Sequence, residues 1–537
     1  MTQGTHDAAS SVLDGVGEVI ASFGPVTITP DDQQYADLVR RELNQRFIGS
    51  PEAVRLVGHP SQVAPVVQQA VREGKRLTVI SGGHCLEGFV FEPDVQVVLD
   101  VSRLNRVYYD HQLNAVAVES GATLMDVYDA LYKTWGVIIP AGICNSVGMG
   151  GHVAGGGYGM LARQHGLVVD HLFAVEVVVV DAAGRARTVV ATRRENDPNR
   201  DLWWAHTGGG GGNFGVVTRY LFRSPGAKGA QPSEILPKPP ASVYVSAIGL
   251  PWSEVSRDEF RRLVRNFGAW HVANSAPDSP TNIIGSELAL THVHDGFIGL
   301  ITQADATAPN ALGVLEDYLH AVLDGVDTQP QALTRDIGEH RAMAAFETPR
   351  ELPWLQATRF IGTENISLND PTLRADYKSA YMRENFTDAQ IDLFHDFLTR
   401  PDLDNGDLSV TLSSYGGKVS AVDPAATAQP HRGARFQLLW MALWGDAADD
   451  DRHIGWLREF YSAVFADTGG VPVPNGVTDG CYVNYPDVDL GNPEHNRSGV
   501  PWHDLYYKDN YRRLQQVKKR YDPRNVFRHE QSIRLPS

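Results

Sequence analysis

The chain is poor in cysteine, with only Cys85, Cys144 and Cys481 among its 537 residues. An odd and sparse set of cysteines does not form a disulfide framework, so we expect a reducing compartment and a cytoplasmic protein. The N-terminal stretch lacks a basic start followed by an apolar run, and no window is apolar for long enough to span a bilayer. We therefore expect neither a signal peptide nor a membrane segment.

Positive charge is also in short supply. Lys and Arg number 47 against 64 Asp and Glu, which gives a formal net charge of −17. Nucleic acids and anionic membranes both select basic surfaces, so neither is expected as a partner. The hydrophobic content of 42% and the charged content of 21% are typical of a globular protein with ample core. The chain is longer than a single hydrophobic core usually organises, so we predict two or more folding units.

Local patterns predict several helices and the points where the chain divides. Apolar residues at helical spacing predict a helix behind Ser61, which would act as its N-cap. A Thr123–Asp126 capping box predicts a second helix, and a third is predicted from Trp502 as far as Pro523. The stretch "PGAKGAQPSEILPKPPAS" is rich in Pro, Gly and Ser and is interpreted as a linker. The predicted parts are residues 1–45, 46–235, 236–475 and 476–537.

Glycine is abundant and gathers in loops that carry nucleophilic side chains. "SGGHCLEG" places His84 after two glycines, and "AGICNSVGMGGHVAGGGYG" places Cys144 in a second loop. A third run, Gly208 to Gly212, matches GxGxxG together with Gly215. The following "VVTRYLF" has the composition of a strand, whereas a Rossmann site requires a helix there, so we reject the Rossmann interpretation. Glycines that lead directly into a strand indicate close approach of the backbone to a ligand.

Taken singly, the cysteines and histidines have ordinary structural explanations. A lone cysteine is usually a small buried apolar residue, and Cys85 and Cys481 are interpreted in this way. His292 and His294 can share a strand face, but no third ligand accompanies them. No C-x-x-C or paired-His spacing supports a metal site that includes His84, so none is expected.

Five motifs occur in series across most of the chain, and together they carry a resemblance. They are "SGGHCLEG", "PAGICNSVGMGGHVAGGGYG", "GGGGNFGVVTRY", "YVNYPD" and "YDPRNVF". The chain resembles the berberine-bridge-enzyme-like branch of the vanillyl-alcohol-oxidase flavoproteins, above all the bacterial hexose oxidases that tailor glycopeptide antibiotics. The resemblance implies an α+β fold. A PCMH-type FAD-binding domain would comprise residues 46–235 and 476–537, and an α+β substrate domain, residues 236–475, would cover the flavin with an antiparallel sheet.

The resemblance also implies FAD bound covalently at two points. His84 would attach to the flavin 8α-methyl group and Cys144 to C6, since both side chains are nucleophiles and the oxidised ring is electron-poor. Both attachments lie on one ring, so the N5 end would stay open to a bulky substrate. His152 matches a position near the flavin N1–C2 carbonyl, whereas Ile80 departs from the arginine that relatives often carry. The remaining cofactor-binding positions are Ser81, Gly82, Gly83, Gly148, Gly150, Gly151, Gly215, Val217 and Asn525.

Three tyrosines are candidates for proton transfer. Tyr485 in "YVNYPD" matches the catalytic tyrosine of the family, and Tyr158 and Tyr415 rank second and third. An unperturbed phenol has a pKa of about 10, so Tyr485 must have a lowered pKa or act in concert with hydride departure. Tyr482 would point to the opposite face if this stretch is extended.

The leading functional hypothesis is an FAD-dependent oxidase that acts on a sugar hydroxyl of a glycosylated natural product. A primary alcohol would pass through aldehyde to acid, with hydride transferred to flavin N5 and O₂ reduced to H₂O₂. The expected partners are a glycosylated small molecule and oxygen, and the protein is expected to be a monomer or homodimer. Alternatives are oxidation of a secondary alcohol or oxidative ring closure with the same flavin, a binding protein with an inactive site, and a reductase of related fold.

Overall fold

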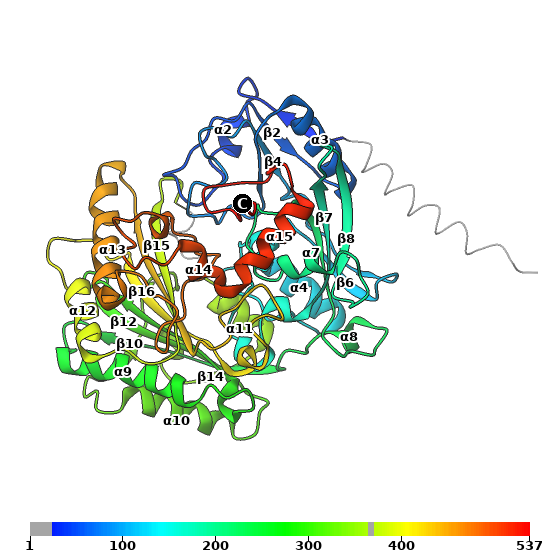
Figure 1. The fold of residues 1–537 in the computed structure, drawn as a ribbon. Helices are drawn as coiled ribbons and strands as arrows, with labels where there is room; N and C mark the ends of the chain where they lie inside the picture. The colour runs from blue at the N-terminus through cyan, green and yellow to red at the C-terminus, as the bar shows by residue number, and fades with distance from the viewer. Residues whose placement is uncertain (1–23, 364–369) are drawn as a thin grey trace, which may run out of the picture.

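The computed structural model describes residues 24–363 and 370–537 and contains three β-sheets (Figure 1). The first sheet has the order β1-β2-β4-β3, with β2 and β3 parallel to β4 and β1 antiparallel to β2. Because β3 ends at Ile80, the chain passes directly from this sheet into the His84 loop. The strands are β1 (Val26–Ile28), β2 (Ala53–Leu56), β3 (Leu77–Ile80) and β4 (Val97–Asp100).

Helix α3 (Val63–Glu73) connects β2 to β3 and buries Val66, Val67 and Ala70 at helical spacing. Its predicted start was wrong. Ser61 lies in a short 3-10 turn, where its own N–H donates to His59 Nδ1, so Ser61 does not cap α3. The sequence pattern did not distinguish a 3-10 turn from the first turn of an α-helix, because both place a polar residue before the apolar stripe.

The second sheet is antiparallel, with the order β5-β6-β9-β7-β8. Thr123 and Asp126 form the predicted capping box at the start of α4 (Leu124–Trp135). The "VVTRYLF" segment is strand β9, which confirms that no Rossmann helix follows the five glycines. The strands are β5 (Val107–Asp110), β6 (Ala115–Glu119), β7 (Leu172–Val180), β8 (Ala186–Thr192) and β9 (Val216–Phe222). Short helices in this region are α2 (Tyr35–Leu38), α5 (Met149–Ala154), α6 (Ala162–His165), α7 (Arg200–Ala205) and α8 (Pro232–Ile235).

The third sheet is antiparallel and has eight strands, in the order β13-β10-β12-β11-β16-β17-β15, with β14 paired to β10. The strands are β10 (Ser242–Pro251), β11 (Ile284–Thr291), β12 (Phe297–Asp305), β13 (Gln331–Ala332), β14 (Arg350–Pro353), β15 (Arg374–Met382), β16 (Leu408–Ser414) and β17 (Phe436–Trp444). Four helices pack along its outer side (Figure 1), namely α9 (Arg257–Ala273), α10 (Ala311–Leu323), α12 (Asp388–Leu398) and α13 (Asp450–Val464). A further helix, α11 (Trp354–Ile361), packs against α4 of the first region.

Successive residues of this sheet face opposite sides, and the two sides differ in character. Leu288, Leu412 and Trp440 belong to the buried core cluster that includes the helices. Their neighbours Glu287 and Ser413, which are paired in the β11–β16 register, line a cavity on the other side. The α+β fold with an antiparallel sheet, predicted from the motifs, is confirmed.

The C-terminal segment returns to the first region. Helices α14 (Trp502–Tyr507) and α15 (Tyr511–Tyr521) pack against each other, and α15 lies beside α7 (Figure 1). The buried Lys518 ammonium of α15 donates to the Asn213 carbonyl and pairs with Asp522 at 2.7 Å. The single helix predicted from Trp502 was wrong, because Lys508 has φ +48° and interrupts it. In the described part of the chain, no helix combines the length and the apolar character that crossing a membrane requires.

Candidate active site

A cavity of about 400 Å³ lies where the three sheets and the C-terminal segment meet. Its lining contains both glycine-rich loops, part of the five-glycine run and the inner side of the large sheet. Asn525 and Tyr415 are not part of this lining. The predicted site residues that do line the cavity are Ser81, Gly82, Gly83, His84, Cys144, Gly148, Gly150, Gly151, His152, Tyr158, Gly215, Val217 and Tyr485.

The side chains of His84 and Cys144 come together at one hydroxyl group. The Oγ atom of Ser146 lies 2.9 Å from His84 Nε2 and 3.9 Å from Cys144 Sγ. Burial lowers the pKa of His84 to about 4, so its imidazole is neutral at pH 7 and retains a nucleophilic lone pair. Burial, followed by the charge of Glu339, raises the pKa of the Cys144 thiol to about 12. Both residues thus present nucleophilic atoms to the same cavity, with the thiol in its protonated form.

Glycine is needed in these loops for two different structural reasons. A Cβ on Gly82 would lie 2.3 Å from the Gly148 amide nitrogen, and one on Gly148 would lie 2.3 Å from Ser81 Oγ. These two glycines therefore allow the loops to touch each other. Gly151 and Gly211 have open space where a Cβ would project, and both line the cavity. Their bare backbone is available to a ligand.

The neighbouring histidine, His152, has a defined tautomer. Its Nε2 atom accepts a hydrogen bond from the Gly142 N–H at 3.2 Å, and burial lowers its pKa to about 4. A neutral imidazole that accepts at Nε2 carries its proton on Nδ1. The Nδ1–H group of His152 is therefore a hydrogen-bond donor that is separate from the Nε2 atom in contact with Gly142.

The tyrosine hydroxyls form the second chemical feature of the cavity. Tyr158 Oη and Tyr485 Oη lie 2.8 Å apart, and burial raises the pKa of both phenols well above 10. Tyr482 accepts hydrogen bonds from the Gly157 N–H and the Asn484 amide. Its ring centroid is 5.1 Å from that of Tyr485. Tyr482 was expected on the opposite face only if this stretch is extended, and that condition is not met, because the stretch forms a turn with a bond from the Tyr485 N–H to the Tyr482 carbonyl.

Tyr415 lies behind these residues. It is fully buried, its ring centroid is 6.2 Å from that of Tyr158, and its carbonyl accepts from the Arg163 guanidinium. Asn525 has φ +52° and a buried side-chain oxygen for which the described residues supply no hydrogen-bond partner. These two positions therefore surround the cavity at a distance and do not line it.

Four polar residues of the cavity, Glu287, Glu339, His340 and Ser413, were not predicted from the sequence. Glu287 Oε2 accepts from His340 Nε2 at 2.9 Å, and Glu287 Oε1 accepts from Ser413 Oγ at 3.1 Å. Glu339 lies beside this group, and burial raises the pKa of its carboxyl to about 7. The sequence offered one signal for this group. The acidic residue Glu287 directly precedes the apolar "LAL" in "IGSELALT". Across residues 24–363 and 370–537 no group of three or more His, Cys, Asp or Glu side chains has an arrangement that could hold a metal ion.

Comparisons with known proteins agree with this geometry. Residues 51–189 match the family described as FAD binding domain, and residues 481–534 match the family described as Berberine and berberine like. The chain is 48% identical to the aclacinomycin-N/aclacinomycin-A oxidase of Streptomyces galilaeus, over 98% of this chain and 93% of that protein. It is 32% identical to the hexose oxidase of Chondrus crispus, over 92% of each chain.

Solved structures give the same result. CrmK, a flavoenzyme of caerulomycin biosynthesis, is 46% identical with a TM-score of 0.91, and the match covers 96% of this chain and 100% of that one. The glycopeptide hexose oxidase DBV29, solved with teicoplanin, is 46% identical with a TM-score of 0.88, over 95% and 99% of the two chains.

The fold and the cavity define an FAD-linked oxidoreductase. The neutral imidazole and the thiol at one end, and the open backbone at Gly151 and Gly211, fit an FAD molecule. The chain belongs to the berberine-bridge-enzyme-like family of FAD-binding oxidases.

Proposed function

We propose that this protein oxidises a sugar hydroxyl of a glycosylated natural product, with FAD attached covalently through His84 and Cys144. Bound FAD would supply an acceptor at N5 for the hydride of the carbinol carbon, and O₂ would take up the two electrons as H₂O₂. The observation that carries the proposal is one cavity in which the Tyr158–Tyr485 hydroxyl pair, the two nucleophiles and the polar Glu287 group occur together.

The protein residues supply binding and proton transfer. Glu287, His340 and Ser413 form a hydrogen-bonded set on the inner side of the sheet, and such a set suits the hydroxyl groups of a sugar. On β17, the strand next to β16, the apolar side chains of Leu439, Met441 and Leu443 line the same cavity and suit the apolar part of a natural product.

Tyr485 would receive the proton of the reacting hydroxyl. Because burial raises the pKa of Tyr485, the phenol is not ionised beforehand, and the proton must move as the hydride departs. A neutral phenol can accept this proton only as it releases its own, so the Tyr485 proton would pass to Tyr158 at 2.8 Å while Tyr158, also a neutral phenol, releases its proton to water. The sequence left two explanations for proton transfer to Tyr485, a lowered pKa or concerted transfer. The raised pKa supports concerted transfer.

The names of the relatives support the substrate class, since they include an aclacinomycin oxidase, a hexose oxidase and a glycopeptide hexose oxidase. The test is to incubate the yellow protein under air with aclacinomycin A, teicoplanin and simple hexoses and to measure H₂O₂. Substrate-dependent peroxide is expected with at least one sugar-bearing compound. Absence of peroxide from all of them, with no anaerobic bleaching of the flavin, would contradict the proposal.

Product mass separates the proposed reaction from its alternative. A primary alcohol that is oxidised to an acid gains one oxygen and loses two hydrogens. A secondary alcohol that is oxidised, or a ring that is closed, only loses two hydrogens. The gain of oxygen is the expected result.

A further inference from the structure

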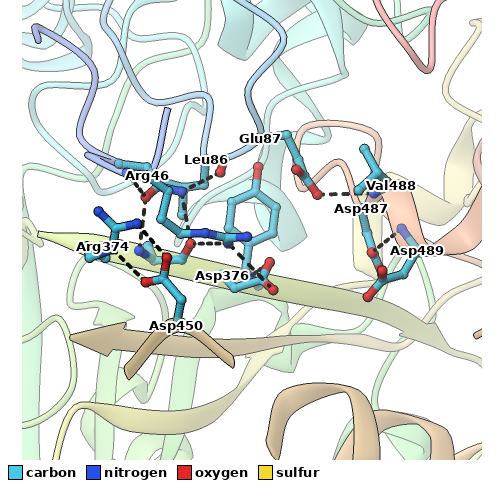
Figure 2. Close-up of polar contacts among 12 residues, drawn as sticks. Arg46, Leu86, Glu87, Arg374, Asp376, Asp450, Asp487, Val488 and Asp489 are labelled. Carbon is cyan, nitrogen blue, oxygen red and sulfur yellow. Dashed lines mark hydrogen bonds and ion pairs between the residues drawn. The ribbon is translucent and has the colours of Figure 1, made fainter. Parts of the chain in front are cut away.

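A buried polar network connects the loop that carries His84 to the turn that carries Tyr485 (Figure 2). Glu87 follows His84 by three residues and is only 7% exposed. Its Oε1 atom accepts a hydrogen bond of 3.1 Å from the Val488 N–H (Figure 2), and Val488 follows Tyr485 by three residues. One carboxyl group thus joins segments that are 401 positions apart in the sequence.

The same loop is also fixed to the large sheet. The Asn44 amide donates to the Leu86 carbonyl at 2.6 Å and to the Ala375 carbonyl at 2.9 Å, and Asn44 Oδ1 accepts from the Ala375 N–H at 3.0 Å. Ala375 lies on β15, two residues before Tyr377, whose ring centroid is 5.7 Å from that of Tyr485. The position of the His84 loop relative to the sheet is therefore set by Asn44, whereas its position relative to the Tyr485 turn is set by Glu87.

Among the described residues, the cation nearest to Glu87 in electrostatic effect, Lys378, forms its ion pairs with other carboxylates. Lys378 pairs with Asp487 at 2.9 Å and with Asp489 at 2.7 Å, and Arg458 pairs with Asp489 at 2.7 Å. Burial, followed by the charges of Asp376 and Asp487, raises the pKa of Glu87 well above its usual value. The raised pKa favours the protonated form of this carboxyl, whose Oε1 atom accepts the Val488 N–H.

We propose that Glu87 is a positioning residue that holds the Tyr485 turn in register with the His84 loop through its hydrogen bond to the Val488 N–H. The inference rests on the proposed function, because it gives the bond a purpose: a fixed distance between the attached flavin and the proton-accepting hydroxyl. Rate depends steeply on such distances, and a displacement near 1 Å can cost about a hundredfold in turnover.

Two substitutions remove the bond from opposite sides. Glu87→Ala removes the acceptor, and Val488→Pro removes the donor. Val488 is the first residue of a 3-10 turn (Val488–Gly491), where proline is tolerated, and the preceding Asp487 has an extended backbone compatible with proline. Glu87→Gln keeps a neutral acceptor of nearly the same shape and serves as the rescue variant. Asp450→Asn breaks the Arg374–Asp450 pair of the same region (Figure 2) without touching Val488 and serves as the control.

The first measurement needs no substrate. Amide hydrogen exchange of the flavin-loaded protein, followed by mass spectrometry, reports the stability of residues 481–489. We expect exchange there to rise about tenfold in Glu87→Ala and Val488→Pro, by no more in the double variant than in either single one, and to stay unchanged in Glu87→Gln and Asp450→Asn. Equal loss of protection in Glu87→Gln and Glu87→Ala, or unchanged protection in Glu87→Ala, would overturn the proposal.

The second measurement separates positioning from general destabilisation. With aclacinomycin A as the probe, the anaerobic rate of flavin reduction should fall about 10- to 100-fold in Glu87→Ala and Val488→Pro, while the substrate dissociation constant and the covalent flavin content stay unchanged. An unchanged reduction rate in a folded, fully flavinylated Glu87→Ala protein would contradict the inference. If the wild type reacts neither with this probe nor with teicoplanin or simple hexoses, the proposed function is at fault, and the hydrogen-exchange result still decides the role of Glu87.

Discussion

The hydroxyl oxygens of Tyr158 and Tyr485 lie 2.8 Å apart although 327 positions separate the two residues in the chain. Tyr158 follows the glycine-rich segment after α5, and Tyr485 belongs to the C-terminal segment that returns to the first region. The two hydroxyls therefore meet only when the C-terminal segment has packed against the first region. Their contact brings a donor and an acceptor together where we propose that the proton moves.

This contact ranks the three tyrosine candidates. We expect Tyr485→Phe to lower the rate of anaerobic flavin reduction by about 10²- to 10⁴-fold, the usual contribution of a general base. Tyr158→Phe should have a smaller effect, because it removes the second oxygen of the pair and leaves the first. Tyr415→Phe should stay close to the wild type, since Tyr415 does not line the cavity. A rate in Tyr415→Phe as low as that in Tyr485→Phe would refute this order.

The two nucleophiles predict a pattern of flavin attachment. The intact mass of the wild type should include FAD after denaturation. His84→Ala and Cys144→Ala should each retain covalent flavin through the remaining residue, and only the double variant should release it all on acid precipitation. Complete release from either single variant would show that one attachment, not two, is present.

The two kinds of glycine give a matched pair of variants. Gly148→Ala should impair folding and flavin loading together, because its Cβ would lie 2.3 Å from Ser81 Oγ and 2.4 Å from the Gly82 nitrogen. Gly151→Ala should fold with an unchanged thermal midpoint as the apoprotein, because its Cβ would meet no protein atom within 4 Å. The Gly151 variant should nevertheless bind FAD more weakly, and titration of apoprotein with FAD measures this. Equal loading of Gly151→Ala and wild type would show that the ligand does not approach this glycine.

Glu339 predicts a pH dependence of stability. Burial raises the pKa of its carboxyl from 4.5 to about 7, so the folded state holds a proton that the unfolded state has already lost between these values. The carboxyl therefore destabilises the folded protein increasingly as the pH rises from 4.5 to 7, by up to about 3 kcal/mol, and the cost is constant above pH 7. Glu339→Gln should raise the thermal midpoint at pH 8 and have little effect at pH 5.

The control for this prediction is Glu316→Gln, since Glu316 is exposed on α10. Its thermal midpoint should follow that of the wild type at both pH values. A gain for Glu339→Gln that is the same at pH 5 and pH 8 would exclude titration of Glu339 as the cause. Glu339→Gln should also bind substrate less well, because it replaces a carboxyl group that lines the cavity.

Much of the first region could be predicted from the sequence because its signals are local. The Thr123 capping box, strand β9 after the five glycines and the two loops with His84 and Cys144 all depend on neighbouring residues. The motif series in turn led to the family. The oligomeric state, the cytoplasmic location and the domain boundaries stay predictions.

The missed features depend on contacts between distant segments. Glu287 and His340 meet across a turn and a strand, and the bond from Val488 to Glu87 joins opposite ends of the chain. Neither pair has a fixed spacing that could identify it. Local signals also failed at Lys508. Its positive φ interrupts the helix there, although the composition of the segment is that of a continuous helix.

The alternation along the large sheet has a consequence for how such enzymes diversify. Along these strands, side chains that line the cavity alternate with side chains that pack in the core under the helices, as Glu287 and Leu288 or Met441 and Trp440 illustrate. Substitutions at the first kind of place can therefore accumulate without loosening the scaffold. A lineage with this architecture can exchange one antibiotic scaffold for another while keeping its redox chemistry intact.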